Sequence, residues 1–228
     1  MLPRRTTLTM PRELTVPITY LVTSGETTDA TTPSSADFLA LLALVERAAA
    51  ARVTLVQLRE KALSARTLYE LASRAARLTR STTTRLLVND RADIARAAGC
   101  DGVQLTTRSL DASVMRRTFG PDFLVGVSTH TLQEARDARD GGADFAVFGP
   151  VFDTPTKRQY GPPLGLERLR EAAHALAPFP LVAIGGVGEV NARDVLRAGA
   201  VGVAAIRLFA DGQSLARTVH LIESLSAL

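Results

Sequence analysis

The feature that most limits how this chain can fold is an eightfold alternation of short apolar runs with longer helical segments. Each apolar run has the composition of a buried strand, and a segment with helical periodicity follows it. Strands that alternate with helices pair in parallel, because the chain must cross back before the next strand begins. The predicted strands are Thr19–Thr23, Val53–Arg59, Leu86–Asn89, Gly102–Leu105, Leu124–Ser128, Phe145–Val151, Leu181–Ile184 and Gly202–Ile206.

The segments between these strands have the signals of helix ends. Cap-like residues precede several of them, namely Ser64, Ser109, Thr131 and Asn191. Glycine closes others, as at Gly99 and Gly199. The predicted helices include Ala36–Ala51, Ala65–Arg80, Arg91–Ala98, Leu132–Asp140, Leu166–Ala175, Ala192–Ala198 and Gln213–Leu225.

Eight such units in a chain of 228 residues predict an α/β fold, a single-domain (β/α)8 TIM barrel over residues 18–228. An open doubly wound sheet is the alternative, but no Gly-x-Gly-x-x-Gly pattern follows the first strand. Residues 1–17 are rich in Arg, Thr and Pro and lack the apolar region of a signal peptide. We expect them to form a flexible tail on a cytoplasmic protein.

Composition excludes several classes of partner. The net charge is only +4, and no stretch combines dense basic residues with aromatic ones, so nucleic acid is a poor candidate. No apolar run approaches the ~20 residues of a membrane span. Cys100 is the only cysteine, and we expect it to be a buried, inert thiol. A small acidic ligand fits best, with self-association into a homo-oligomer left open.

Polar side chains gather at the end of the second predicted strand. Side chains alternate along a strand, so Val53, Leu55, Gln57, Arg59 and Lys61 share one face. The apolar half of that face belongs in a core. The polar half then forms a socket for a polyanion such as phosphate. The alternative is a salt-bridged strand end, and this segment alone leaves both interpretations open.

The active site of a (β/α)8 barrel lies at the carboxyl ends of its strands. A second anion socket is predicted there, formed by the Gly185-Gly186 turn and the end of the eighth strand, because backbone N–H groups can approach an anion closely where Cβ atoms are missing. An ordinary tight turn is the alternative. The other candidates at this end are Asn89, Asp90, Ser128, His130, Thr154, Thr156, Lys157, Ile206 and Arg207. The loop with Thr154, Thr156 and Lys157 is expected to join the socket of the second strand. The two sockets indicate two phosphorylated ligands, or one ligand with charge at both ends.

Two of these candidates have a competing structural role. Asp90 is able to hold Mg²⁺ against a diphosphate, or to cap the helix predicted at Arg91–Ala98. His130 is the only one of three histidines at a strand's carboxyl end, and it suits either an acid–base role or a helix cap.

The motifs, in their order along the chain, make it similar to the thiamine phosphate synthase superfamily, which includes thiazole tautomerases. The similarity covers Thr19 to about Phe209. Its markers are Gln57-Leu58-Arg59-Glu60-Lys61, Asn89-Asp90-Arg91-Ala92-Asp93-Ile94-Ala95, Gly126-Val127-Ser128-Thr129-His130-Thr131, Phe148-Gly149-Pro150-Val151-Phe152, Thr154-Pro155-Thr156-Lys157 and Ala183-Ile184-Gly185-Gly186.

This resemblance implies that a hydroxymethylpyrimidine diphosphate condenses with a thiazole phosphate, with Mg²⁺ on the departing pyrophosphate. Gln57, Arg59, Lys61 and Lys157 would hold the diphosphate, Asn89 and Ser128 would touch the pyrimidine or diphosphate, and Asp90 would bind Mg²⁺. Thr154, Thr156, Gly186 and the backbone around Ile206 would hold the thiazole phosphate, with Arg207 beside them. The catalytic candidates are Lys61, Lys157, Ser128 and His130.

The chain departs from the synthase pattern after its fourth strand. The synthases show His-x-Gly-Gln-x-Asp there, whereas this chain has Gln104-Leu105-Thr106-Thr107-Arg108-Ser109. Ser109 therefore replaces a second metal-binding carboxylate, which predicts a weakened Mg²⁺ site. A synthase is the favoured function because the diphosphate socket is complete. A thiazole tautomerase with His130 as acid–base, or a non-catalytic phosphate-binding barrel, is the alternative.

Overall fold

The computed structural model, which describes residues 14–154 and 162–226, is a closed barrel of eight parallel strands. The strands pair in chain order, and the last one hydrogen-bonds to the first. They are β1 (Ile18–Val22), β2 (Leu55–Leu58), β3 (Arg85–Asn89), β4 (Gly102–Leu105), β5 (Leu124–Thr129), β6 (Phe145–Phe148), β7 (Leu181–Ile184) and β8 (Gly202–Ala205). The predicted fold class is thereby confirmed.

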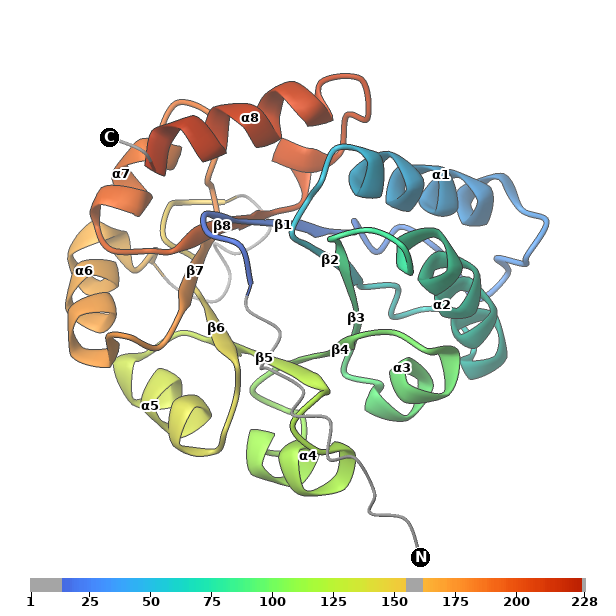
Figure 1. Ribbon diagram of the computed structural model, residues 1–228, viewed down its shortest axis with the longest axis horizontal. Coiled ribbons are helices and arrows are strands. Elements are labelled where there is room, and N and C mark those ends of the chain that lie inside the picture. The colour runs from blue at the N-terminus through green and yellow to red at the C-terminus, as the bar shows by residue number, and fades with distance from the viewer. Residues whose placement is uncertain (1–13, 155–161, 227–228) are drawn as a thin grey trace, which may run out of the picture.

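Helices form a ring outside the strands (Figure 1). Within the described residues they are α1 (Ala36–Ala50), α2 (Ala65–Thr79), α3 (Ala92–Ala98), α4 (Ala112–Phe119), α5 (Leu132–Asp140), α6 (Gly165–Leu176), α7 (Ala192–Arg197) and α8 (Leu215–Ser226), with a short 3₁₀ helix, η2 (Arg207–Phe209), after β8. None of these helices combines the length and the apolar character needed to cross a membrane.

Side-chain alternation along the strands divides the core into two layers. Tyr20, Leu55 and Phe145 belong to a cluster inside the barrel. Their strand neighbours Leu21 and Val56 pack outward under the helices. The functional end of the barrel therefore rests on a filled interior rather than on an open pore.

Three strands are shorter than predicted, namely β2, β6 and, by the single residue Ile206, β8. β2 begins at Leu55 because Val53 closes the turn after α1, donating its N–H to Ala48 at 3.0 Å, and packs in the outer layer. The inward face predicted for Val53 is therefore wrong, whereas it holds for Leu55. β6 ends at Phe148, two residues before Pro150, which has no N–H to contribute to a ladder.

Two of the four predicted caps hold helix ends as expected. Ser64 accepts from the N–H of Thr67, and Thr131 forms a capping box with Glu134. Ser109 is no cap, because α4 begins after Asp111 and the Ser109 hydroxyl accepts from the N–H of Thr106.

Asn191 occupies the N-cap position of α7 but bonds to the preceding loop. Its side-chain amide donates to the carbonyl of Gly186 at 3.0 Å, and its side-chain oxygen accepts from the N–H of Gly188 at 2.8 Å. Its side chain therefore fixes the turn after β7 rather than the first turn of the helix.

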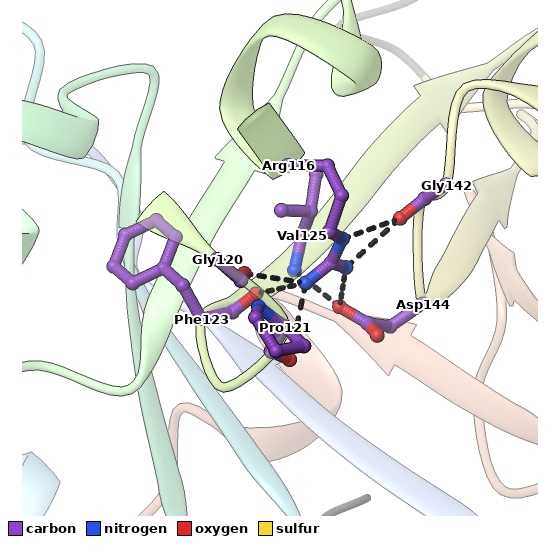
Figure 2. A network of polar contacts seen from close by, with 7 residues as sticks. All are labelled: Arg116, Gly120, Pro121, Phe123, Val125, Gly142 and Asp144. Carbon is purple, nitrogen blue, oxygen red and sulfur yellow. Dashed lines mark hydrogen bonds and ion pairs between the residues drawn. The ribbon is translucent and has the colours of Figure 1, made fainter. Parts of the chain in front are cut away.

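At the opposite end of the barrel, Arg116 on α4 ties two loops together. Its guanidinium donates to Asp144 Oδ2 at 2.8 Å, and the same oxygen accepts from the N–H of Val125 at 2.7 Å. Its carbonyl acceptors are Gly120, Pro121, Phe123 and Gly142, at 2.8–3.1 Å (Figure 2). This end of a (β/α)8 barrel serves stability, and one guanidinium satisfies much of its loop backbone.

We expect Arg116→Ala to lower the free energy of unfolding by about 2–4 kcal/mol, because it leaves several half-buried acceptors without a donor. Arg116→Lys should recover little of this loss, since an ammonium lacks the planar fork of donors. Urea denaturation measures both, with Arg117→Ala, an exposed arginine on the same helix, as the control. Equal losses for the 116 and 117 variants would contradict a structural role for this network.

Candidate active site at the carboxyl ends of the strands

Three of the predicted ligand-binding side chains belong to one hydrogen-bonded chain. Gln57 in β2 donates its amide to Asn89 Oδ1 at 3.0 Å. Gln104 in β4 donates to Ser128 Oγ at 3.1 Å. Tyr20 in β1 joins the two halves, since its hydroxyl donates to Gln104 Oε1 at 3.0 Å and lies 3.3 Å from Gln57 Oε1. Five consecutive strands thus contribute to one polar cluster.

Sequence reasoning gave no role to Tyr20 or Gln104. Tyr20 lies in an apolar strand and reads as a core residue, and Gln104 was noted only as a departure from the synthase pattern. The available signal was a glutamine in the middle of a buried strand, Gly-Val-Gln-Leu, which needs a polar partner inside the barrel.

Arg59 lies just beyond β2, half-buried, and anchors to the loop after β1. Its backbone N–H donates to Thr23 Oγ1 at 2.8 Å, and its guanidinium reaches the carbonyl of Ser24 at 3.5 Å. Among the described residues, Arg59 makes no ion pair, so the salt-bridged alternative is not seen for this side chain. Lys61 is exposed two residues further on.

Glu60, between these two cations in sequence, is a residue whose role the sequence did not reveal. It is 3% exposed. Its carboxylate accepts from the hydroxyls of Thr23 and Thr27 and from the N–H groups of Gly25 and Thr27. The buried charge therefore fixes the loop after β1 against the end of β2, which holds Arg59 in place.

Asp90 does not cap α3. The N-cap position belongs to Arg91, and Asp90 has a left-handed backbone with φ 61°. Its N–H bonds to the carbonyl of Gln104 at 2.9 Å, which holds that conformation. Arg91 pairs with Asp93 at 2.6 Å, and this hydrogen bond lowers the pKa of the Asp93 carboxyl. The carboxylate of Asp90 is exposed, with no hydrogen-bond partner among the described residues.

Asp90 offers a metal ion a carboxylate ligand at this end of the barrel. In the described part of the chain, no three His, Cys, Asp or Glu side chains cluster in a way that would hold an ion. Ser109 turns its hydroxyl into its own loop, 3.1 Å from Thr106 Oγ1. Mg²⁺ commonly uses one or two carboxylates together with phosphate oxygens. Asp90 therefore fits a Mg²⁺ ion that arrives with a diphosphate.

His130 is exposed, and its ring is oriented by the loop after β6. Its Nδ1 lies 2.5 Å from the carbonyl of Gly149, and since a carbonyl only accepts, Nδ1 carries the proton. The helix cap is Thr131 instead. No hydrogen bond to the other ring nitrogen is found within residues 14–154 and 162–226, and that nitrogen suits acid–base chemistry.

The second predicted socket centres on the turn after β7. Gly186 has φ +68°, and a Cβ there would lie 2.7 Å from Phe152 Cβ, so this turn needs glycine for packing as well as for any anion. Thr154 is 9% exposed, and its hydroxyl has no hydrogen-bond partner among the described residues. Ile206 and Arg207 adjoin the start of η2, and Arg207 is exposed. Thr156 and Lys157 lie outside the described residues.

Cys100 is buried, as expected. Burial raises the pKa of its thiol to about 12, so the thiol stays protonated at neutral pH. Nucleophilic chemistry needs the thiolate, which this burial disfavours.

Fold and site together define a (β/α)8 barrel with hydrogen-bond donors at the carboxyl ends of its strands. The family model described as "Thiamine monophosphate synthase" matches residues 21–209, and the chain belongs to that family. The family inferred from the motifs is therefore confirmed.

Named relatives agree with this assignment. A putative thiamine-phosphate synthase of Geobacter sulfurreducens is 49% identical over 166 residues, which are 73% of this chain and 78% of that protein. The thiamine-phosphate synthase of Moorella thermoacetica is 45% identical over 165 residues, 72% and 78% of the two chains. A thiamine phosphate pyrophosphorylase from Pyrococcus furiosus superposes with a TM-score of 0.75 at 28% identity, covering 92% of this chain and 96% of that one. The predicted enzyme class, a transferase of this type, is confirmed.

Proposed function

We propose that this protein condenses a hydroxymethylpyrimidine diphosphate with a thiazole phosphate to give thiamine phosphate and pyrophosphate. The observation that carries the proposal is the donor cluster of Gln57, Asn89 and Ser128 at the strand ends of a member of this family. The buried hydroxyl of Thr154, which has no hydrogen-bond partner among the described residues, supports a phosphate site across the mouth.

The reaction breaks the bond between the pyrimidine methylene carbon and the diphosphate oxygen, whose electrons leave with pyrophosphate. The thiazole nitrogen then forms the new carbon–nitrogen bond. Arg59, Lys61 and Lys157 would stabilise the charge that develops on the leaving group, which is the main requirement of such an ionisation. Mg²⁺, held by Asp90 and the diphosphate oxygens, would supply further positive charge at the same place.

A tautomerase remains the second candidate, because the ring of His130 is oriented by Gly149 with one nitrogen available. Tautomerisation of a thiazole carboxylate phosphate needs a positioned acid–base group, and His130 would supply it.

The direct test is incubation with both synthase substrates, with and without Mg²⁺, and detection of thiamine phosphate. We expect product that depends on both substrates and increases with Mg²⁺. Absence of product, with thiazole carboxylate phosphate isomerised instead, would assign the chain to the tautomerases. Ligand binding without either reaction would leave the non-catalytic binding barrel.

The remaining expectations accompany this proposal. A cytoplasmic location, small phosphorylated substrates as the partners, no nucleic acid, and self-association stay predictions. So does the placement of residues 1–17 outside the barrel domain.

A further inference from the structure

A chain of polar side chains crosses the interior of the barrel immediately beneath its mouth. Its central member, Tyr20, is 0% exposed, and the flanking Gln104 and Gln57 are 1% and 5% exposed. Polar groups this deeply buried are costly unless they are satisfied, and here each finds a partner. The chain runs from Asn89 through Gln57, Tyr20 and Gln104 to Ser128.

The tyrosine hydroxyl sets the direction of the hydrogen bonds on the Gln104 side of this chain. It has one proton, so it donates to one of its two neighbouring amide oxygens, and the nearer of these is Gln104 Oε1. Gln104 therefore accepts on its inner side and donates its NH₂ group on its outer side, to Ser128. Burial raises the pKa of Tyr20 well above its ordinary value, so the hydroxyl keeps its proton.

This direction determines what the Ser128 end of the chain offers a ligand. Gln104 Nε2 also lies 3.5 Å from the carbonyl of Leu105, an acceptor, which agrees with an NH₂ group on the outer side. Ser128 Oγ already accepts from Gln104, which leaves its O–H to donate. A donor at the mouth suits the acceptor atoms of a diphosphate or a pyrimidine ring.

The interior is shaped to hold the tyrosine in this place. The Tyr20 ring meets Phe145 edge-on, with ring centroids 5.9 Å apart and an angle of 79° between the planes. Gly126 makes room for both neighbours, because a Cβ there would lie 2.4 Å from Gln104 Oε1 and 2.4 Å from the Phe145 ring.

We propose that Tyr20 is a positioning residue whose hydroxyl fixes the orientation of the Gln104 amide, so that Ser128 presents a donor to the pyrimidine diphosphate. The identity of the ligand rests on the proposed function. Tyr20 itself lies beneath the site and acts through Gln104.

The test removes only the hydroxyl, with Tyr20→Phe. We expect a folded protein whose affinity for the pyrimidine diphosphate, measured by calorimetry, falls roughly tenfold, the factor that one weakened hydrogen bond to a charged group corresponds to. Affinity for the thiazole phosphate should not change. Tyr69→Phe, on the exposed side of α2, is the matched control and should alter neither affinity.

A second variant reverses the direction without removing the tyrosine. Gln104→Glu replaces the NH₂ group with an oxygen, so the Ser128 hydroxyl must donate inward and is lost to the ligand. We expect the same selective loss of pyrimidine diphosphate affinity. Unchanged pyrimidine diphosphate affinity in Tyr20→Phe, or an equal loss for both ligands, would overturn the inference. Failure of the wild type to form thiamine phosphate would instead overturn the proposed function alone.

Discussion

Lys61→Ala should lower kcat/KM for thiamine phosphate formation by about 10²–10³-fold, the usual cost of removing a group that stabilises charge in the transition state. His130→Gln should leave the same reaction within about tenfold, because ionisation of a diphosphate does not require a proton to move through an imidazole. Steady-state rates with both substrates measure the two variants side by side.

The low lysine content of the chain allows a second, independent measurement on Lys61. Lys61 and Lys157 are the only lysines among the 27 basic residues of the chain, and arginine serves everywhere else. An amine-reactive reagent followed by peptide mass analysis therefore reports on these two side chains with little background. Pyrophosphate should protect Lys61 from labelling. Lys61→Arg, which keeps the charge, is the control for a purely electrostatic role and should retain more activity than the alanine variant.

A larger effect of the His130 substitution than of the Lys61 substitution would change the functional assignment. Loss of an acid–base group typically costs ~10²–10⁴-fold. If the wild type isomerises thiazole carboxylate phosphate, and His130→Gln loses that activity while Lys61→Ala keeps it, the protein belongs with the tautomerases.

Asp90→Asn should lower Mg²⁺-dependent activity by about 10²-fold or more, because a metal that neutralises a leaving diphosphate contributes several kcal/mol to the transition state. Asparagine tolerates the left-handed backbone at this position, so the fold should be retained. Activity as a function of Mg²⁺ concentration is the measurement. Asp93→Asn, which alters a neighbouring exposed carboxylate already paired with Arg91, is the matched control.

Ser109→Asp should strengthen Mg²⁺ binding by adding a second carboxylate to that of Asp90. The affinity of Mg²⁺ for the protein–pyrophosphate complex, measured by calorimetry, should therefore increase. The Ser109 hydroxyl bonds within its own loop, to Thr106, so the aspartate must turn outward to reach the ion. Unchanged Mg²⁺ affinity would show that this loop does not border the metal, and it would contradict our expectation that Ser109 weakens the Mg²⁺ site.

The sequence predicted the barrel because the fold depends on local periodicity repeated many times. An error at a single position, such as predicting that the second strand starts at Val53 rather than at Leu55, does not change the pattern of eight alternating units. The start of β2 and the end of β6 were predicted wrongly from the apolar pattern. The hydrogen bond from Val53 to Ala48 in α1 and the proline at position 150 leave that pattern unchanged, so the pattern could not reveal them.

The candidate site was predictable where the rule for strand ends applies, as for Gln57, Asn89 and Ser128, which the structure brings into one chain. Motif similarity alone suggested Thr156 and Lys157, which lie outside the described residues. The choice between metal ligand and helix cap at Asp90 depended on its backbone conformation, which only the folded chain reveals.

By itself, the sequence determined the class of fold, the family and the end of the barrel where the candidate ligand groups lie, since periodicity and ordered motifs are properties of the chain. Only the tertiary structure decided that Tyr20 and Gln104 belong to the hydrogen-bonded chain at the candidate site and that Glu60 fixes the loop after β1. Their partners lie far away in sequence, and the direction of a hydrogen bond depends on which donor meets which acceptor after the barrel has closed.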